Sequence, residues 1–228
     1  SKLFLLSRKE TFTVGMNSFR GNYAYMGLPV TYFFMGDHAL KIAAIYMAFI
    51  VPIVNILSVI SLSMGSKREI RLKEVLKFSV SNAIVIGCVV GLISLFTGFK
   101  LPYVIDKSID ILTQVTLPLA LLNIGASFNF KYITSKIAPS ILIILLKLLL
   151  LPSISLLIIL LFKIEINVYC KVLIIMLSSP CASVNYVLAS SLEGDVDLTL
   201  SSIISTTILS IITYPLWYSI ILNIARIN

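Results

Sequence analysis

"SFRGNYAYMGLPV", residues 18–30, lies within a long apolar region, yet it contains an arginine, an asparagine, two glycines and a proline. An uninterrupted helix in lipid would avoid this combination, because proline removes a backbone hydrogen bond and charged side chains are costly in hydrocarbon. Non-helical backbone at membrane depth is tolerated only where protein surrounds it or where it lines a cavity. The stretch therefore predicts a membrane helix that is interrupted inside the protein.

The composition places the whole chain in the lipid bilayer. Hydrophobic residues make up 58% of the 228 residues and charged residues only 12%, which is about half the usual share in a soluble domain. The run "ILIILLKLLLLPSISLLIILLF", residues 141–162, exceeds the roughly 20 apolar residues that span a bilayer. The sequence thus predicts an all-α integral membrane protein, multi-pass in the cell membrane.

The net charge of +8 has a simple explanation in such a protein. The basic residues cluster in short loops between apolar segments, a pattern that orients membrane helices, so we expect no nucleic-acid partner. The three cysteines and the single histidine have no spacing typical of a metal site or a disulfide framework. We also find no nucleotide-binding loop and no catalytic triad, and we expect neither a cofactor nor enzymatic activity.

The apolar segments predict seven spans, joined mostly by short loops. These spans are approximately residues 10–35, 39–64, 78–97, 109–126, 137–162, 168–192 and 196–224. The longest polar connection, "GSKREIRLKEVLK" at residues 65–77, carries five basic residues and is therefore predicted to be cytoplasmic. Alternation of sides then places the C-terminus outside.

A second interruption is predicted in the sixth span, at "LSSPCASVNYVLASSLEGDVDL", residues 177–198. Proline suits the first turn of a helix, where its missing N–H would have no partner, and serine is a common N-cap. We predict a half-helix that ends near Leu177 and a second that begins at Pro180 with Ser179 as its cap. By the same logic, Gly27 and Leu28 interrupt the first span.

Pro29 would then open a half-helix that ends near Gly36. Paired interrupted helices are typical of transporters built from inverted repeats, which bind their substrate at the interruptions. New helix N-termini carry partial positive charge and attract anions. The predicted substrate-binding residues are Asn22, Gly27, Pro29, Ser179, Pro180, Asn185 and Lys147.

Two basic residues within the spans have alternative interpretations. Lys147 would either balance a substrate carboxylate or serve structure, by donating to carbonyls freed by Pro152 or by extending toward the membrane surface. Arg20 would either contact the substrate or pair with Glu10 or a helix end. All ten acidic residues lie in loops or at span ends, so we expect no acidic side chain to carry a coupling ion.

Several motifs resemble the auxin efflux carrier family, which includes plant PIN auxin exporters and bacterial malate permeases. The motifs are "RGNYAYMGLP", "VPIVNILSVISL", "LPLALLNIGASFNFK", "KLLLLP" and "SPCASVNYVLASSLEGDVDL". The resemblance implies ten helices in two inverted five-helix repeats, with crossed interrupted helices at positions four and nine. It also implies elevator-like movement against a scaffold and a homodimer formed through that scaffold.

On this plan the seven spans correspond to helices four to ten, with the earlier helices expected to be absent. Residues 1–64 would end the first repeat, residues 65–77 would link the repeats, and residues 78–228 would form the second repeat. The predicted function is secondary transport or facilitated passage of small organic anions, carboxylates above all. The alternatives are a seven-span sensor or receptor and a non-functional fragment of a transporter.

Overall fold

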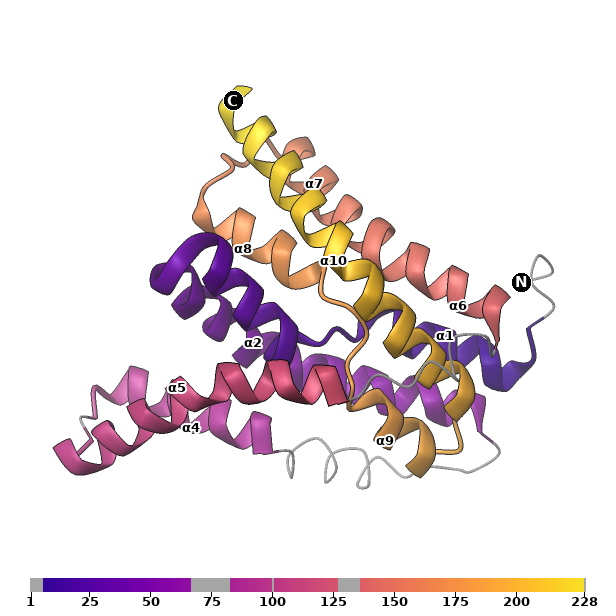
Figure 1. Cartoon of the computed structure of the whole chain (residues 1–228), viewed down its shortest axis with the longest axis horizontal. Helices are drawn as coiled ribbons and strands as arrows, with labels where there is room; N and C mark the ends of the chain where they lie inside the picture. The colour runs from indigo at the N-terminus through magenta and orange to yellow at the C-terminus, as the bar shows by residue number, and fades with distance from the viewer. Residues whose placement is uncertain (1–5, 67–82, 100, 127–135, 228) are drawn as a thin grey trace.

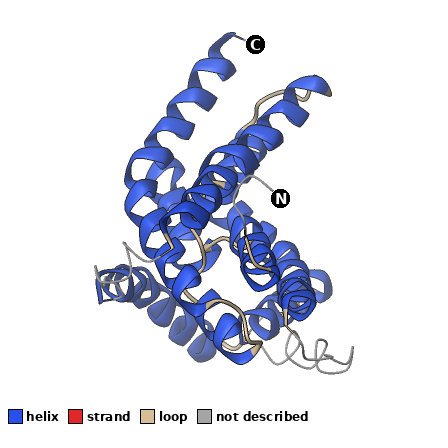
Figure 2. Cartoon of the chain, turned by 90° about the vertical axis from the view of Figure 1, so that its right-hand side faces the viewer, coloured by secondary structure: helices blue, strands red, loops and turns tan. Residues whose placement is uncertain are grey.

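The computed structural model describes residues 6–66, 83–99, 101–126 and 136–227, and every regular element in these ranges is helical (Figure 2). Two of the elements, η1 and η3, are wider π-helical segments. The elements are α1 (Arg8–Phe19), η1 (Tyr23–Gly27), α2 (Leu28–Gly65), α4 (Ala83–Thr97), α5 (Tyr103–Ala126), α6 (Ile137–Ile144), η3 (Leu145–Leu150), α7 (Leu151–Leu161), α8 (Val168–Leu177), α9 (Asn185–Ser191) and α10 (Val196–Ile227).

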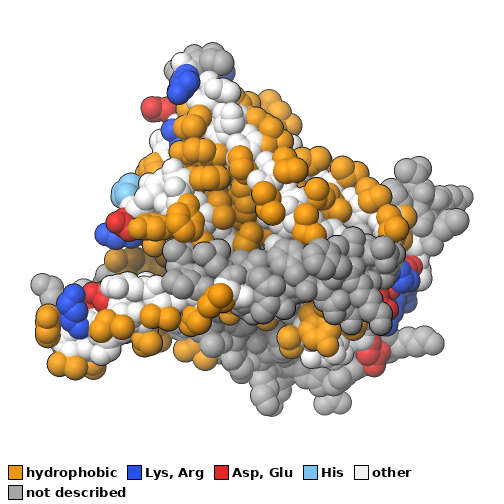
Figure 3. All heavy atoms as spheres, viewed as in Figure 1, with side chains coloured by type: hydrophobic (Ala, Val, Ile, Leu, Met, Phe, Trp, Pro, Cys, Tyr) orange, Lys and Arg blue, Asp and Glu red, His pale blue; other side chains and the backbone are white. Residues whose placement is uncertain are grey.

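Three helical stretches are long and apolar enough to cross a membrane: Tyr23–Gly65, Ile137–Leu161 and Val196–Arg226. In Figure 3, hydrophobic side chains cover much of the visible face, whereas charged side chains gather toward the edges of the molecule. An apolar surface of this extent is suited to lipid. The prediction of an all-α membrane protein is therefore confirmed.

The first of these stretches is too long for a single straight pass, and it is divided at Gly36. Its 43 residues would extend about 65 Å as one straight helix, roughly twice the thickness of the hydrocarbon core. Gly36 divides it, with φ 76° and ψ −172°, a conformation that residues with a Cβ rarely adopt. Figure 1 shows the chain turning back near the start of α2. The boundary between the first two spans was predicted at this place.

The remaining helices pack around the two interrupted ones. In Figure 1, α6 runs beside α10, while α8 and the first part of α2 lie on the other side of α10. Leu156, Ile174 and Trp217 join α7, α8 and α10 in one buried cluster. Ala43 and Met176 belong to a second cluster that joins α2 to α8. Two further buried clusters include residues of α1, α6 and α9, so α1, α2 and α6–α10 form one packed body.

Helices α4 and α5 extend away from this body as an arm (Figure 1). Their side chains include some of the most exposed large hydrophobics, such as Phe96 at 79% and Tyr103 at 76%. Gly87, Gly91, Leu92 and Leu95 of α4 face η1 and α2 across a cavity. Most of the predicted basic loop, residues 67–77, lies outside the described residues, and the division into two repeats remains a prediction.

Candidate functional site

The two interrupted helices cross each other through their backbones. Gly21 and Cys181 form an antiparallel bridge. The N–H of Asn22 donates to the carbonyl of Pro180 at 2.7 Å, and the N–H of Ala182 donates to the carbonyl of Arg20 at 3.2 Å. Backbone groups freed by one interruption are thus satisfied by the other, as burial at membrane depth requires. The crossed arrangement implied by the family resemblance is confirmed.

The first interruption lies earlier than predicted. Helix α1 ends at Phe19, and the chain becomes helical again at Tyr23. Asn22 caps the new helix, because its Oδ1 accepts a hydrogen bond from the N–H of Tyr25 at 3.3 Å. An asparagine cap starts a helix without proline. The prediction that Gly27 and Leu28 form the break was therefore wrong.

Gly27 and Pro29 instead lie within the helix that follows the break. The π-helical segment η1 ends at Gly27, and Pro29 is the second residue of α2, directly after this wider segment. A Cβ on Gly27 would lie 2.9 Å from both Met176 Sδ and Ser179 Oγ. Glycine at this position permits the close approach of α8, a packing role rather than a role in the break.

The second interruption begins where predicted and ends later. Helix α8 ends at Leu177, but the next helix starts at Asn185 rather than at Pro180. Pro180 lies in the extended segment that pairs with the first interruption, and the φ of proline suits extended backbone as well as a first helical turn. Ser179 is not the predicted cap, since its Oγ accepts a hydrogen bond from the Tyr214 hydroxyl at 3.0 Å.

A small cavity of about 70 Å³ lies beside the crossing. Its polar side chains are Arg20, Asn22 and Ser183, and Asn22 Nδ2 donates to Ser183 Oγ at 3.4 Å across the two interruptions. The complete lining is Arg20, Gly21, Asn22, Tyr23, Ala24, Tyr25, Val51, Val54, Ala182, Ser183 and Val184. The cavity therefore combines one cation, one amide and the start of the helix at Tyr23.

A larger cavity of about 740 Å³ shares Ala24 and Tyr25 with the small one. It lies between the crossing and the α4–α5 arm. Its full lining is Ala24, Tyr25, Leu28, Ala44, Ile45, Met47, Ala48, Gly87, Gly91, Leu92, Leu95 and Thr113. These residues are mostly apolar. The small cavity therefore provides polar groups, and the larger cavity beside it provides a mostly apolar lining.

Asn185, a predicted site residue, faces away from the small cavity. Its Nδ2 donates to Asn17 Oδ1 at 2.9 Å, and Asn17 Nδ2 in turn donates to the carbonyl of Thr13 and to Thr199 Oγ1. Both asparagines are fully buried. This network connects α9, α1 and α10 behind the crossing, and a direct contact between Asn185 and substrate remains a prediction.

Lys147 is fully buried and donates from Nζ to the carbonyl of Leu177 at 3.2 Å. It also lies 5.4 Å from the centre of the Tyr23 ring. A cation at the C-terminal end of a half-helix is favoured by the helix dipole, and the ring adds a cation–π contact. The lysine neither extends to the membrane surface nor donates to a carbonyl freed by Pro152, and it does not line the small cavity.

Arg20 does not pair with Glu10. Its Nη1 donates to Ser58 Oγ at 3.2 Å and to the carbonyl of Val54 at 3.4 Å, both on α2. Glu10 instead contacts Lys136 Nζ at 2.6 Å, and the same Nζ lies 3.5 Å from Asp195. The hydrogen bond from Lys136 lowers the pKa of Glu10 to about 2. These three charged residues link the N-terminal ends of α1, α6 and α10.

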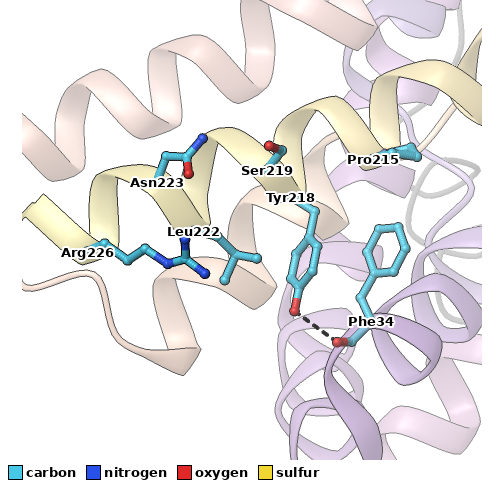
Figure 4. A pocket seen from close by; sticks show the side chains of 7 residues that line it. All are labelled: Phe34, Pro215, Tyr218, Ser219, Leu222, Asn223 and Arg226. Atoms are coloured by element: carbon cyan, nitrogen blue, oxygen red, sulfur yellow. Dashed lines mark hydrogen bonds between the residues drawn. The ribbon is translucent and has the colours of Figure 1, made fainter.

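A separate cavity of about 310 Å³ lies along the last turns of α10 (Figure 4). The Tyr218 ring stacks on Phe34 with 4.7 Å between ring centres, and its hydroxyl donates to the carbonyl of Phe34 at 3.0 Å. The lining comprises Phe34, Pro215, Tyr218, Ser219, Leu222, Asn223 and Arg226. It shares no residue with the cavities at the crossing.

In the described part of the chain, no cluster of three or more His, Cys, Asp or Glu residues could hold a metal ion.

Sequence reasoning missed several lining residues. Ser183 follows the predicted half-helix start, and Val54 lies in the motif "VPIVNILSVISL" together with Ser58, which binds Arg20 without lining the cavity. No local pattern marks any of them as facing the crossing. The one available signal was Arg20, a charged residue beside a glycine at membrane depth. Its partners come from a helix 34 and 38 residues further along the chain.

A helical membrane protein whose two interrupted helices cross beside a cavity has the architecture of a secondary transporter. Comparison with known proteins agrees: a family model described as membrane transport protein matches residues 1–218. The chain belongs to this family, the auxin efflux carrier family that the motifs predict, and it is a membrane transporter.

Two archaeal relatives are similar over most of the chain. An uncharacterized transporter of Methanocaldococcus jannaschii, MJ1031, is 27% identical over 225 residues, which cover 97% of this chain and 72% of the relative. An uncharacterized transporter of Methanothermobacter thermautotrophicus is 29% identical over 202 residues, which cover 86% of this chain and 63% of the relative. The chain thus spans about two thirds of the length of these relatives.

Proposed function

We propose that the protein carries small organic anions across the cell membrane and binds their carboxylate group at the crossing of the two interrupted helices. The observation that supports this proposal most strongly is the crossing itself, closed by the 2.7 Å bond from Asn22 N–H to Pro180 and flanked by a cavity with a polar lining. Such crossings bring helix ends together at membrane depth, where a transporter binds its substrate.

The helix that starts at Tyr23 favours an anion in the small cavity. Tyr23, Ala24 and Tyr25 form its first turn and all line the cavity. The first turn of a helix carries partial positive charge and N–H groups without helical partners. Asn22 Nδ2 adds an amide donor at the same place, already directed to Ser183 Oγ across the crossing. A carboxylate would accept hydrogen bonds from these donors, apart from the Tyr25 N–H, which already donates to Asn22 Oδ1.

The dimensions of the cavities support an anion with a body larger than its carboxylate. Ligand pockets are typically about 300–1,000 Å³, so the small cavity of about 70 Å³ would hold a carboxylate group only. The adjoining cavity of about 740 Å³ would hold the rest of the molecule. Auxin-like and malate-like carboxylates both remain within this proposal.

Transport would proceed by elevator-like movement of the packed body against the α4–α5 arm. The large cavity supports this division, because its lining joins η1 and α2 on one side to Gly87, Gly91 and Leu95 of α4 on the other. The exposed apolar side chains of the arm would face lipid or a second copy in a homodimer. In this proposal residues 65–77 lie in the cytoplasm and the C-terminus lies outside.

The experiment that tests this proposal is uptake by the full-length protein, expressed from its complete reading frame and reconstituted in liposomes. Radiolabelled indole-3-acetate and malate are suitable probes. We expect saturable uptake of at least one of them above protein-free liposomes. Saturable binding without uptake would favour the sensor alternative, and the absence of both would contradict the proposed substrate class.

A further inference from the structure

We propose that Arg20 is the residue that recognises the charge of the substrate, through a two-pronged contact between its guanidinium and the substrate carboxylate. This inference rests on the proposed function, because it assigns a specificity-determining residue within the same site. Helix dipoles and amide donors carry only partial charges, whereas Arg20 adds one full positive charge to the lining of the small cavity.

The burial of Arg20 needs a counter-charge that the described part of the protein does not supply. The residue is only 4% exposed. Its described hydrogen-bond acceptors, Ser58 Oγ and the Val54 carbonyl, are both neutral, and no ion pair involves it within the described ranges. An unpaired charge at membrane depth is costly, and such residues usually face a partner or a water-filled cavity. Arg20 lines the small cavity, so an anion there would complete its environment.

The hydrogen bonds of Arg20 leave its Nε without a partner among the described residues. Both described bonds come from Nη1 and fix the side chain to α2. Nε is buried and has no hydrogen-bond partner among the described residues. Nε and Nη2 form the side edge of the guanidinium, and parallel donors of this kind match the two oxygens of a carboxylate. The Nε–Nη2 edge is therefore the edge that we assign to the substrate carboxylate.

The neighbours of Arg20 suit this contact. Asn22, two residues later, contributes its amide to the same cavity, and Ser183 faces it from the second interruption. Lys147, the other buried cation near the crossing, is bound to the Leu177 carbonyl and does not line the cavity. Among the described residues that line the small cavity, Arg20 is the only charged one, so charge selectivity would depend on it.

The test compares an anion with a neutral analogue of nearly the same shape. Equilibrium binding of indole-3-acetate and of indole-3-acetamide is measured on the purified full-length protein and on Arg20→Gln. We expect the Kd for the acetate to rise tenfold to a hundredfold in Arg20→Gln, the loss that corresponds to about 1.5–3 kcal/mol for hydrogen bonds to a charged group. The Kd for the amide should change less than about twofold. A merely structural role would weaken both ligands together.

Arg8→Gln is the matched control. Arg8 also extends from α1 to a carbonyl of α2, with Nε donating to Met64 at 2.9 Å, but it is exposed and lies away from the cavity. We expect this variant to bind both ligands as the parent does. Arg20→Lys keeps the charge and lacks the two-pronged edge, so its preference for the acetate should fall between those of the parent and Arg20→Gln.

The outcomes separate this inference from the proposed function. A parent protein that binds and carries neither indole-3-acetate nor malate would contradict the proposed function. A parent that carries the acetate, with a folded Arg20→Gln variant of unchanged preference, would overturn the role of Arg20 alone. If Arg20→Gln does not fold, Arg20→Lys decides: a preference equal to that of the parent would refute the two-pronged contact.

Discussion

Substitution of Asn22 separates its two roles, as the cap of a helix and as a donor to the substrate. Asn22→Ala removes the hydrogen bond from Tyr25 N–H to Oδ1 and the bond from Nδ2 to Ser183 Oγ. Loss of an N-cap costs about 0.5–2 kcal/mol of stability. Loss of a hydrogen bond to a carboxylate costs about 1.5–3 kcal/mol of binding, which is roughly tenfold to a hundredfold in Kd. We expect both effects in the full-length protein.

Asn167→Ala is the matched control, because Asn167 caps α8 by accepting hydrogen bonds from Tyr169 N–H at 3.0 Å and Cys170 N–H at 3.2 Å. It should lower stability by a similar amount and leave the Kd unchanged. Asn22→Asp should retain the cap, but its carboxylate would repel the bound anion. The assays are thermal unfolding in detergent and equilibrium binding of indole-3-acetate. Parent-like binding by both Asn22 variants, with Asn22→Ala destabilised, would show that the residue is only a cap.

Three further predictions concern packing, pH and topology. Gly27→Ala should lower the free energy of unfolding by about 1–3 kcal/mol, because its Cβ would lie 2.9 Å from Met176 Sδ and Ser179 Oγ; a variant as stable as the parent in thermal unfolding would contradict the close contact. The pKa of Glu10 is lowered from 4.5 to about 2, chiefly by the hydrogen bond from Lys136, so its contribution to stability is present above pH 4.5 and is lost as the pH falls toward 2. Thermal unfolding of the parent and of Glu10→Gln should therefore differ at pH 7 and converge near pH 2, and a difference that stays constant with pH would oppose this. Ser66→Cys should react with membrane-impermeant reagents only from the cytoplasmic side, and labelling in intact cells would reverse the proposed orientation.

The sequence was sufficient to predict the interrupted helices, their crossing through the family resemblance, and the end of α8 at Leu177. It misplaced the points where both helices resume, because proline was used to mark a helix start. Proline has a φ that suits extended backbone as well as a first helical turn, and Pro180 lies in the extended pairing. At the first interruption the side chain of Asn22 caps a helix that starts at Tyr23, six residues before Pro29.

The candidate site was less predictable than the fold because its contacts are long-range. Asn22 lines the small cavity, whereas Asn185 and Lys147 face other helices. The side chain that fixes Arg20 belongs to Ser58, on α2. Hydrophobic patterning indicates which segments are helical, but it does not indicate which polar residue of one helix meets which polar residue of another.

The most direct test of the central claim is a structure of the full-length protein with a brominated indole-3-acetate bound. We expect a carboxylate within hydrogen-bonding distance of Arg20 and Asn22, and a bromine signal in the larger cavity near Tyr25 and Gly91. A bromine signal in the separate cavity beside Phe34 and Tyr218, with the crossing unoccupied, would contradict it.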